Sequence, residues 1–179
     1  VDNTIWADDL FMSCQLLLRS YQIENDTKYL DDVIKQIVNF DKYLWDESKQ
    51  LYKHARIGGK EEETEIYWSR ANGWISWTLS DALSIIPKEY SGYKNILDIY
   101  KKVVDGIIKY QSSSGLWYQV LDRDDSFKET SSSAMFTLAI SRGVLNGWLS
   151  NEYEKYALKG WAGISGNITD DGIVKDICR

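Results

Sequence analysis

The segment DDLFMSCQLLLRSYQI, residues 8–23, is apolar on nearly every face of a helix. A helix of this kind packs against neighbours on several sides. The segment that follows, residues 27–44, has a single apolar stripe that includes Leu30, Val33 and Ile37, and it carries charged residues elsewhere. That pattern is typical of a surface helix. Together the two segments predict a hairpin of one inner and one outer helix.

This alternation occurs three times along the chain. Further inner helices are predicted over residues 71–86 and 131–145, and further outer helices over residues 93–110 and 152–164. The inner helices begin near residues 8, 71 and 133, which is a period of about sixty residues. Hairpins of this kind bury their faces only by stacking on one another. The sequence therefore predicts an all-α fold in which three hairpins form about half of a closed ring.

We expect residues 1–179 to form one partial toroid domain within a longer catalytic domain. The chain begins almost on an inner helix and stops at KDICR, just where another inner helix would be due. Three hairpins alone leave inner faces exposed to water, and self-association through those faces would cover them.

Composition and charge exclude several classes of partner. The 179 residues are 44% hydrophobic and 27% charged, which is an ordinary globular composition. A net charge of −6 and a pI near 4.9 argue against nucleic acid or an anionic membrane surface as the partner. No apolar run approaches the roughly 20 residues of a membrane-spanning helix. The localisation stays open between a bacterial cytoplasm and periplasm.

Cysteine and histidine are too scarce to build a metal centre. Cys14 and Cys178 are far apart and the chain has one histidine, which argues against a disulfide framework and against a protein-built zinc site. Cys14 lies in an apolar run and is predicted to be a small core residue. Aromatic residues are abundant instead, with eight Trp and twelve Tyr, more than a core of this size needs.

The loops that enter the inner helices of a ring gather at one mouth, so side chains at the helix starts can meet around a ligand. The loop over residues 46–70 is unusually long, and long loops in compact domains are usually functional or disordered. It holds the only histidine, and its indole and guanidinium groups suit sugar stacking and carboxylate binding. The candidates at this mouth are Trp6, Asp8, Asp9, Tyr52, His54, Arg56, Trp68, Arg70, Asn72, Glu129, Thr130 and Ser131 to Ser133.

Most of these candidates also have a simpler role. An aspartate at a helix start, such as Asp8, is more often an N-cap than a catalyst, and the run ETSSS (residues 129–133) is a good capping cluster. His54 alone is more often a surface or hydrogen-bonded histidine, and Arg56 is more often solvated. Core positions are predicted for Trp74 and Trp77, and a solvated loop tip without chemistry for GGKEEETE (residues 58–65).

Three motifs occur in order at the starts of the inner helices: IWADDLFMS (residues 5–13), WSRANGW (68–74) and ETSSSAMF (129–136). With a histidine between the first two, the sequence resembles the unsaturated rhamnogalacturonyl hydrolases of glycoside hydrolase family 105, which are (α/α)6 barrels. The resemblance covers the later half of that barrel, and a second pocket aspartate of the family lies upstream of this chain. It implies Asp8 as catalytic acid and base, a substrate pocket lined by Trp6, His54, Trp68 and Arg70, and no metal or organic cofactor.

The resemblance also implies a reaction. The family's oligosaccharide substrates end in a sugar acid with a double bond between C4 and C5. One carboxyl group donates a proton to C4 and then, as carboxylate, helps water to add at C5; the hemiketal opens and releases the neighbouring rhamnose. A helix start favours the charged carboxylate, so Asp8 needs water to be excluded by Trp6, Trp68 and the sugar. Asp9, about a quarter turn away, is predicted to be the cap or an orienting partner.

Three alternatives stay open at this point. The related unsaturated glucuronyl hydrolases share the fold and the single-aspartate chemistry but act on glycosaminoglycan fragments. A non-catalytic carbohydrate-binding remnant would keep the aromatic mouth. A purely structural helical array would use the tryptophans for packing, although Trp6 and Trp68 lie before the helices and outside their apolar stripes.

Overall fold

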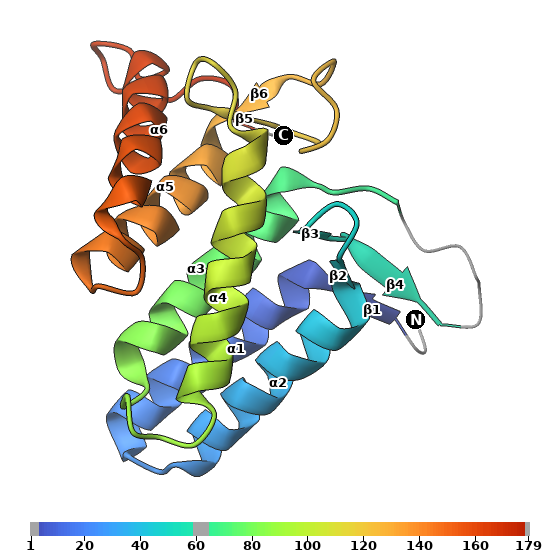
Figure 1. The fold of residues 1–179 in the computed structure, drawn as a ribbon, viewed down its shortest axis with the longest axis vertical. Coiled ribbons are helices and arrows are strands. Elements are labelled where there is room, and N and C mark those ends of the chain that lie inside the picture. Colours follow the sequence, from blue (N-terminus) through green and yellow to red (C-terminus); the bar gives the residue numbers. More distant parts are fainter. Residues whose placement is uncertain (1–3, 59–64, 178–179) are drawn as a thin grey trace.

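Six α-helices in three successive hairpins dominate the computed structural model, which describes residues 4–58 and 65–177 (Figure 1). Cys178 and most of the predicted loop tip lie outside the described residues. The inner helices are α1 (Ala7–Glu24), α3 (Ser69–Ile85) and α5 (Thr130–Leu145). The outer helices are α2 (Lys28–Leu44), α4 (Tyr93–Ile107) and α6 (Glu154–Gly166).

The predicted helices are confirmed, with small differences at their ends. Short 3-10 turns, η1 (Ile108–Tyr110) and η2 (Asn151–Tyr153), replace the end of the fourth predicted helix and the start of the sixth. Asn25 ends α1 in the left-handed conformation, with φ at 54°. Pro87 follows the end of α3, as expected of a residue that cannot continue a helix.

The inner helices form one row and the outer helices cover it. Helix α3 packs between α1 and α5, and α2 packs on both α1 and α4, while α6 packs on α5. The three inner helices run in the same direction (Figure 1). Among the described residues, no helix combines the length and apolarity that crossing a bilayer requires.

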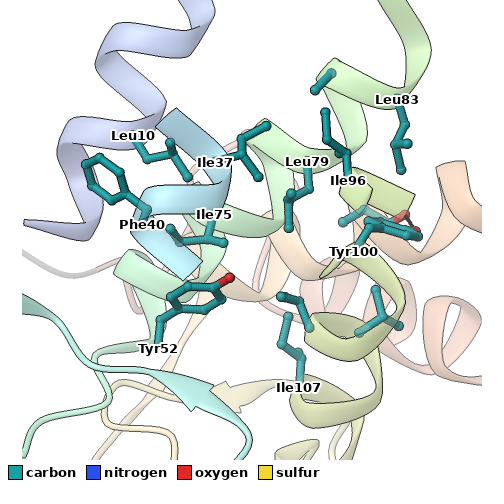
Figure 2. Close-up of a cluster of buried hydrophobic side chains, with 14 of the residues drawn as sticks. Leu10, Ile37, Phe40, Tyr52, Ile75, Leu79, Leu83, Ile96, Tyr100 and Ile107 are labelled. Atoms are coloured by element: carbon teal, nitrogen blue, oxygen red, sulfur yellow. Dashed lines mark hydrogen bonds between the residues drawn. The ribbon is translucent and has the colours of Figure 1, made fainter. Parts of the chain in front are cut away.

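The hydrophobic core lies between the two rows. Leu10, Ile37, Ile75 and Leu79 are almost fully buried there (Figure 2). Each such side chain stabilises the fold by about 1.5–3 kcal/mol relative to an exposed position. Burial also raises the pKa of the Cys14 thiol to about 12, so Cys14 is the small core residue that its apolar run predicts.

Tyr52 belongs to this core, so its predicted place at the mouth is wrong. Its side chain is buried and its hydroxyl donates a hydrogen bond of 2.6 Å to Asp41 Oδ1 on α2 (Figure 2). Its main chain is held by Asn72, whose side-chain amide accepts from Tyr52 N and donates to Tyr52 O, each at 2.9 Å. Asn72 is also expected at the mouth. It is instead buried, and its side chain joins α3 to the strand that contains Tyr52.

Glycine allows two close approaches that set the packing. A Cβ at Gly73 of α3 would lie 2.6 Å from the sulfur of Met135, so the inner helices α3 and α5 meet closely there. A Cβ at Gly106 of α4 would lie 1.9 Å from the carbonyl oxygen of Gln50, where the outer helix touches a turn. A larger residue at Gly106 would force the turn away because its nearest neighbour is main chain, whereas at Gly73 the Met135 side chain would have to move.

Short extended segments precede the inner helices. Their pairing brings the first turns of these helices to the same end of the molecule. The strands are β1 (Thr4–Trp6), β2 (Trp45–Asp46), β3 (Leu51–Tyr52), β4 (Ala55–Ile57), β5 (Trp117–Tyr118) and β6 (Lys128–Glu129), paired β1–β4, β2–β3 and β5–β6. The start of each inner helix is bonded to a segment about fifty residues later: Trp6 pairs with Ala55, Trp68 bridges Val120, and Thr130 N donates to Asp176 O. The expected mouth is therefore present.

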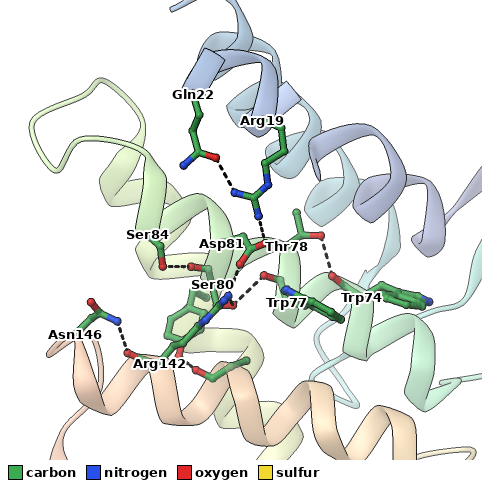
Figure 3. Close-up of polar contacts among 12 residues, drawn as sticks. Arg19, Gln22, Trp74, Trp77, Thr78, Ser80, Asp81, Ser84, Arg142 and Asn146 are labelled. Carbon is green, nitrogen blue, oxygen red and sulfur yellow. Dashed lines mark hydrogen bonds and ion pairs between the residues drawn. The ribbon is translucent and has the colours of Figure 1, made fainter. Parts of the chain in front are cut away.

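A buried carboxylate connects the inner helices toward their other end. Asp81 of α3 forms an ion pair with Arg142 of α5 and lies 3.6 Å from the guanidinium of Arg19 of α1 (Figure 3). Only 6% of the Asp81 side chain is exposed, whereas 33% of Arg142 and 54% of Arg19 are exposed. One side chain thus connects all three hairpins.

Candidate active site

Asp8 and His54 form the centre of the mouth. His54 Nε2 lies 3.2 Å from Asp8 Oδ2, within hydrogen-bonding distance, and the ring donates when its proton is on Nε2. The exposed fractions of the two side chains are 24% for His54 and 30% for Asp8. The pair is thus partly shielded and still open to a ligand.

Both main-chain polar groups of His54, its carbonyl and its N–H, are hydrogen-bonded, and these bonds fix its position. Its carbonyl accepts from Ala7 N at 2.9 Å, which is the first residue of α1, and its N–H donates to Ile66 O at 3.0 Å. The adjoining strand β4 pairs with β1, with Ala55 opposite Trp6. Because these bonds join His54 to the start of α1, they bring it to Asp8 across forty-six residues of chain.

Two indoles flank the imidazole. The ring centroids of Trp6 and His54 are 5.1 Å apart in an edge-to-face arrangement, and those of Trp68 and His54 are 4.8 Å apart. The guanidinium of Arg70 lies 4.4 Å from the centre of the Trp68 ring, as in a cation–π contact. The five residues predicted for the site are therefore joined in one cluster of contacts: Trp6, Asp8, His54, Trp68 and Arg70.

Trp68 is held in place by bonds from its two sequence neighbours, Ser69 and Tyr67, to two other segments. Ser69 N donates to Gln119 O at 2.8 Å, and Leu121 N donates to Tyr67 O at 2.9 Å. The Tyr67 hydroxyl donates to Asp46 Oδ2 at 2.6 Å. Hydrogen bonds from the Ser48 side chain and then from Tyr67 hold the pKa of Asp46 at about 2, so this carboxylate stays an acceptor at any physiological pH.

The adjacent residues Asp8 and Asp9 make different contacts. Asp9 Oδ2 accepts from Trp6 N at 3.3 Å, which is the bond that the third helical residue makes to the N-cap in a capping box. The neighbouring carboxylate, Asp8, is directed at His54 instead. The N-cap residue is Trp6, so the simpler reading of Asp8 as the N-cap is wrong, and Asp9 supports the helix start from within its first turn.

This geometry places an acid, an imidazole, two indoles and a guanidinium at the start of two inner helices. The family model described as Glycosyl Hydrolase Family 88 matches residues 1–179, the whole chain. The chain belongs to glycosyl hydrolase family 88.

The names of two relatives of this family 88 chain agree with the enzyme class that its three motifs indicate. It is 32% identical over 174 residues to the unsaturated rhamnogalacturonyl hydrolase YesR of Bacillus subtilis, across 96% of this chain and 48% of that protein. It is 29% identical over 175 residues to an unsaturated 3S-rhamnoglycuronyl hydrolase of an Alteromonas species, across 94% of this chain and 42% of that protein. The kinship with unsaturated rhamnogalacturonyl hydrolases that the three motifs indicate is confirmed.

Solved structures confirm the fold class. A possible member of the GH105 family from Salmonella enterica superposes with a TM-score of 0.92 at 23% identity, across 98% of this chain and 47% of that chain. The all-α toroid is therefore the fold, and the family 88 chain spans about half the length of the relatives it matches.

Several residues expected at the mouth lie elsewhere. The guanidinium of Arg56 lies 5.5 Å from the ring centre of Tyr43 on the outer helix α2. Glu129 is fully buried and caps α5 by accepting from Ser131 N and Ser132 N, so the capping role of ETSSS is confirmed. Within residues 4–58 and 65–177, no three His, Cys, Asp or Glu side chains come together as metal ligands.

The sequence predicts core positions for Trp74 and Trp77, and the structure places both only partly in the core. Trp74 and Trp77 are only partly buried, stack with centroids 6.0 Å apart, and contact Phe11 of α1 at 4.4 and 5.2 Å. Trp74 lies one helical turn beyond Arg70, and Phe11 lies about one turn beyond Asp8. The sequence feature that could have placed Trp74 and Phe11 near the site is this spacing of about one helical turn from Arg70 and Asp8.

Proposed function

We propose that this chain provides the acid-bearing part of a hydrolase for unsaturated uronyl oligosaccharides, with a terminal unsaturated galacturonate joined to rhamnose as substrate. The observation that supports it is the Asp8–His54 pair between Trp6 and Trp68 at the mouth of a toroid. The names of the two aligned relatives, which act on unsaturated rhamno-linked uronides, favour this class of substrate.

In this proposal Asp8 acts twice. As an acid it donates its proton to C4 of the C4=C5 enol ether, which leaves an oxocarbenium ion at C5. As a carboxylate it then takes a proton from the water that adds at C5. The product hemiketal opens and releases the neighbouring sugar, so one carboxyl group serves both steps, without the carboxylate pair of ordinary glycosidases.

The surroundings of Asp8 suit both protonation states. The positive end of the helix dipole at the start of α1 favours the carboxylate. A sugar bound over Trp6, His54 and Trp68 would exclude water from Asp8, and desolvation favours the neutral acid. The hydrogen bond to His54 fixes the orientation of the carboxyl group as the two effects compete.

Arg70 is the group that we assign to the carboxylate of the substrate. Replacing it by glutamine removes a charge-assisted hydrogen bond, so Arg70→Gln should raise the KM by about 10-fold or more, with a smaller change in kcat. Steady-state kinetics on the disaccharide measures this. Arg56→Gln is the matched control, because Arg56 lies against Tyr43, and its KM should stay within about twofold. Equal effects of the two substitutions would contradict the assignment.

The direct test of the function is the ultraviolet absorbance of the conjugated C4=C5 bond. We expect the absorbance of an unsaturated galacturonyl-rhamnose disaccharide to fall with time in the presence of the protein, faster than that of an unsaturated glucuronyl disaccharide. The reverse order of rates would favour the glucuronyl class, and no decrease with either substrate would leave a carbohydrate-binding role.

A further inference from the structure

The side-chain amide of Asn72 is bonded through its oxygen and through both of its N–H groups. Its Oδ1 accepts from Tyr52 N at 2.9 Å, and its Nδ2 donates to Tyr52 O at 2.9 Å and to Trp68 O at 3.2 Å. Only 1% of the residue is exposed. Asn72 is therefore occupied by the protein itself and does not contact a ligand.

These bonds connect two segments of the candidate active site. Tyr52 precedes His54 by two residues, and Trp68, the N-cap of α3, has its indole 4.8 Å from the imidazole of His54. One amide thus fixes the distance between the strand that leads to His54 and the main chain that begins α3. Arg70 lies in the first turn of α3 and is held on the same side.

The carbonyl of His54 is bonded to a different inner helix. It accepts from Ala7 N, the first residue of α1, and this bond sets His54 relative to Asp8. The bonds of Asn72 set the same segment relative to α3. The relative position of the acid on α1 and the guanidinium on α3 therefore depends on the segment that carries His54.

The next inner helix contains a simpler form of the Asn72 contact. Ser133 is the fourth residue of α5, as Asn72 is of α3. The Ser133 hydroxyl accepts from Trp117 N at 2.9 Å and donates at 2.7 Å to the carbonyl of Glu129, the N-cap of α5. Because a hydroxyl has a single proton, Ser133 cannot also donate to the strand.

Trp117 is equivalent to Tyr52 in the repeat. Both are buried aromatic residues, and they come two residues before Gln119 and His54, whose carbonyls accept from the first N–H groups of α3 and α1. A bond from the strand and a bond to the N-cap carbonyl are therefore part of the repeated fold. The bond from Asn72 Nδ2 to Tyr52 O is an addition that serine cannot make, and it occurs where the strand leads to the histidine.

We infer that Asn72 is a positioning residue for the proposed reaction, and that its bond to Tyr52 O holds the imidazole of His54 in place beside Trp68. Its effect on the rate rests on the function proposed above, whereas its effect on the position of His54 does not. A displacement of about 1 Å from the reactive geometry can lower a rate about 100-fold. A single buried amide that aligns the two inner helices is thus important for catalysis without contact to the substrate.

Asn72→Ser tests the inference, because it gives α3 the residue that α5 has at the equivalent position. The serine hydroxyl can accept from Tyr52 N and donate to Trp68 O, so only the bond to Tyr52 O is lost. We expect kcat for the unsaturated disaccharide to fall about 10-fold or more, because Asp8 and the bound sugar are misaligned. The KM should stay within about threefold, since Arg70 and Trp68 are retained.

Proton NMR of His54 provides a second measurement, which needs no substrate. The chain has one histidine, so the two ring C–H signals of His54 are identified directly. The indoles of Trp6 and Trp68 lie 5.1 and 4.8 Å from the imidazole, and their ring currents shift these signals. In Asn72→Ser the signals should move toward those of histidine in the unfolded chain, while circular dichroism shows unchanged helix content.

Ser133→Ala is the matched control, because it removes both bonds at the equivalent position of α5. It should lower the midpoint of thermal unfolding, since Trp117 N is left buried without its acceptor. The value of kcat should stay within about threefold, and the His54 signals should not move. Asn72→Thr, whose methyl group fills part of the space of the amide, provides the same test if Asn72→Ser does not fold.

The outcomes separate the inference from the proposed function. With an active parent protein, a parental kcat in folded Asn72→Ser would overturn the inference. So would His54 signals that do not move, or that move equally in Ser133→Ala. A parent protein without activity on the disaccharide would end the proposed function instead, and the His54 signals of Asn72→Ser would still decide whether Asn72 positions the imidazole.

Discussion

Asp8→Asn should lower kcat/KM for the unsaturated disaccharide by at least about 1,000-fold. An amide can accept the hydrogen bond from His54, so the geometry of the site is kept, but it can neither donate a proton to C4 nor take one from water. General acid–base catalysis contributes about 10²–10⁴-fold, and one group serves both steps here. The initial rate of absorbance loss, measured at subsaturating substrate, gives the ratio.

Asp9→Asn is the control for this experiment because it changes the adjacent carboxylate in the same way. Asp9 accepts the Trp6 N–H, and asparagine can accept that bond too, so activity should stay within about threefold and stability within about 1 kcal/mol. Comparable losses of activity in the two variants would mean that the two aspartates act only by stabilising the start of α1. Asp8 would then not be the catalytic acid.

Asp81→Asn should lower the free energy of unfolding by about 2–3 kcal/mol. Removing one partner of a buried ion pair costs about 3–5 kcal/mol because a charge stays buried without compensation. Here the cost is reduced, because Arg142 is one-third exposed and Arg19 about half exposed, so water can solvate part of each guanidinium. Urea denaturation followed by circular dichroism measures the change, and thermal unfolding should shift by roughly 4–12 °C.

Asp98→Asn is the matched comparison on α4. Asp98 pairs with Lys94 one turn away at 3.2 Å, and both side chains are mostly exposed. Such pairs contribute about 0.3–0.5 kcal/mol, so the variant should be nearly as stable as the parent. If both substitutions had the same small effect, Asp81 would not connect the hairpins energetically.

Helix positions could be predicted from this sequence because apolar side chains report burial directly. The single stripes of 27–44 and 93–110 identify outer helices, and the period of the inner helices brings Asp8 and Arg70 to one end. The difference between Asp8 and Asp9 also follows from helix geometry, since one residue turns the side chain by about a quarter turn. These features depend only on local spacing.

The remaining errors come from contacts between segments distant in sequence. Tyr52 and Arg56 belong to the same long loop as His54, and only the pairing of β1 with β4 and of β2 with β3 decides which side chain meets Asp8. The inner helix is apolar all round, a pattern that predicts core positions for Trp74 and Trp77, although both are only partly buried. Its sequence therefore does not distinguish a side that faces a neighbour from a side that faces the middle of the ring.

The pairing of Trp6 with Ala55 has a consequence for synthesis on the ribosome. Helix α1 is made before the strand and histidine that complete its site, which are some fifty residues later in the chain. At about 5–20 residues per second, those residues follow roughly 2–9 s after Asp8. Each hairpin is thus translated before the segment that aligns its inner helix, and the acid gains its imidazole only when the second hairpin is about to begin.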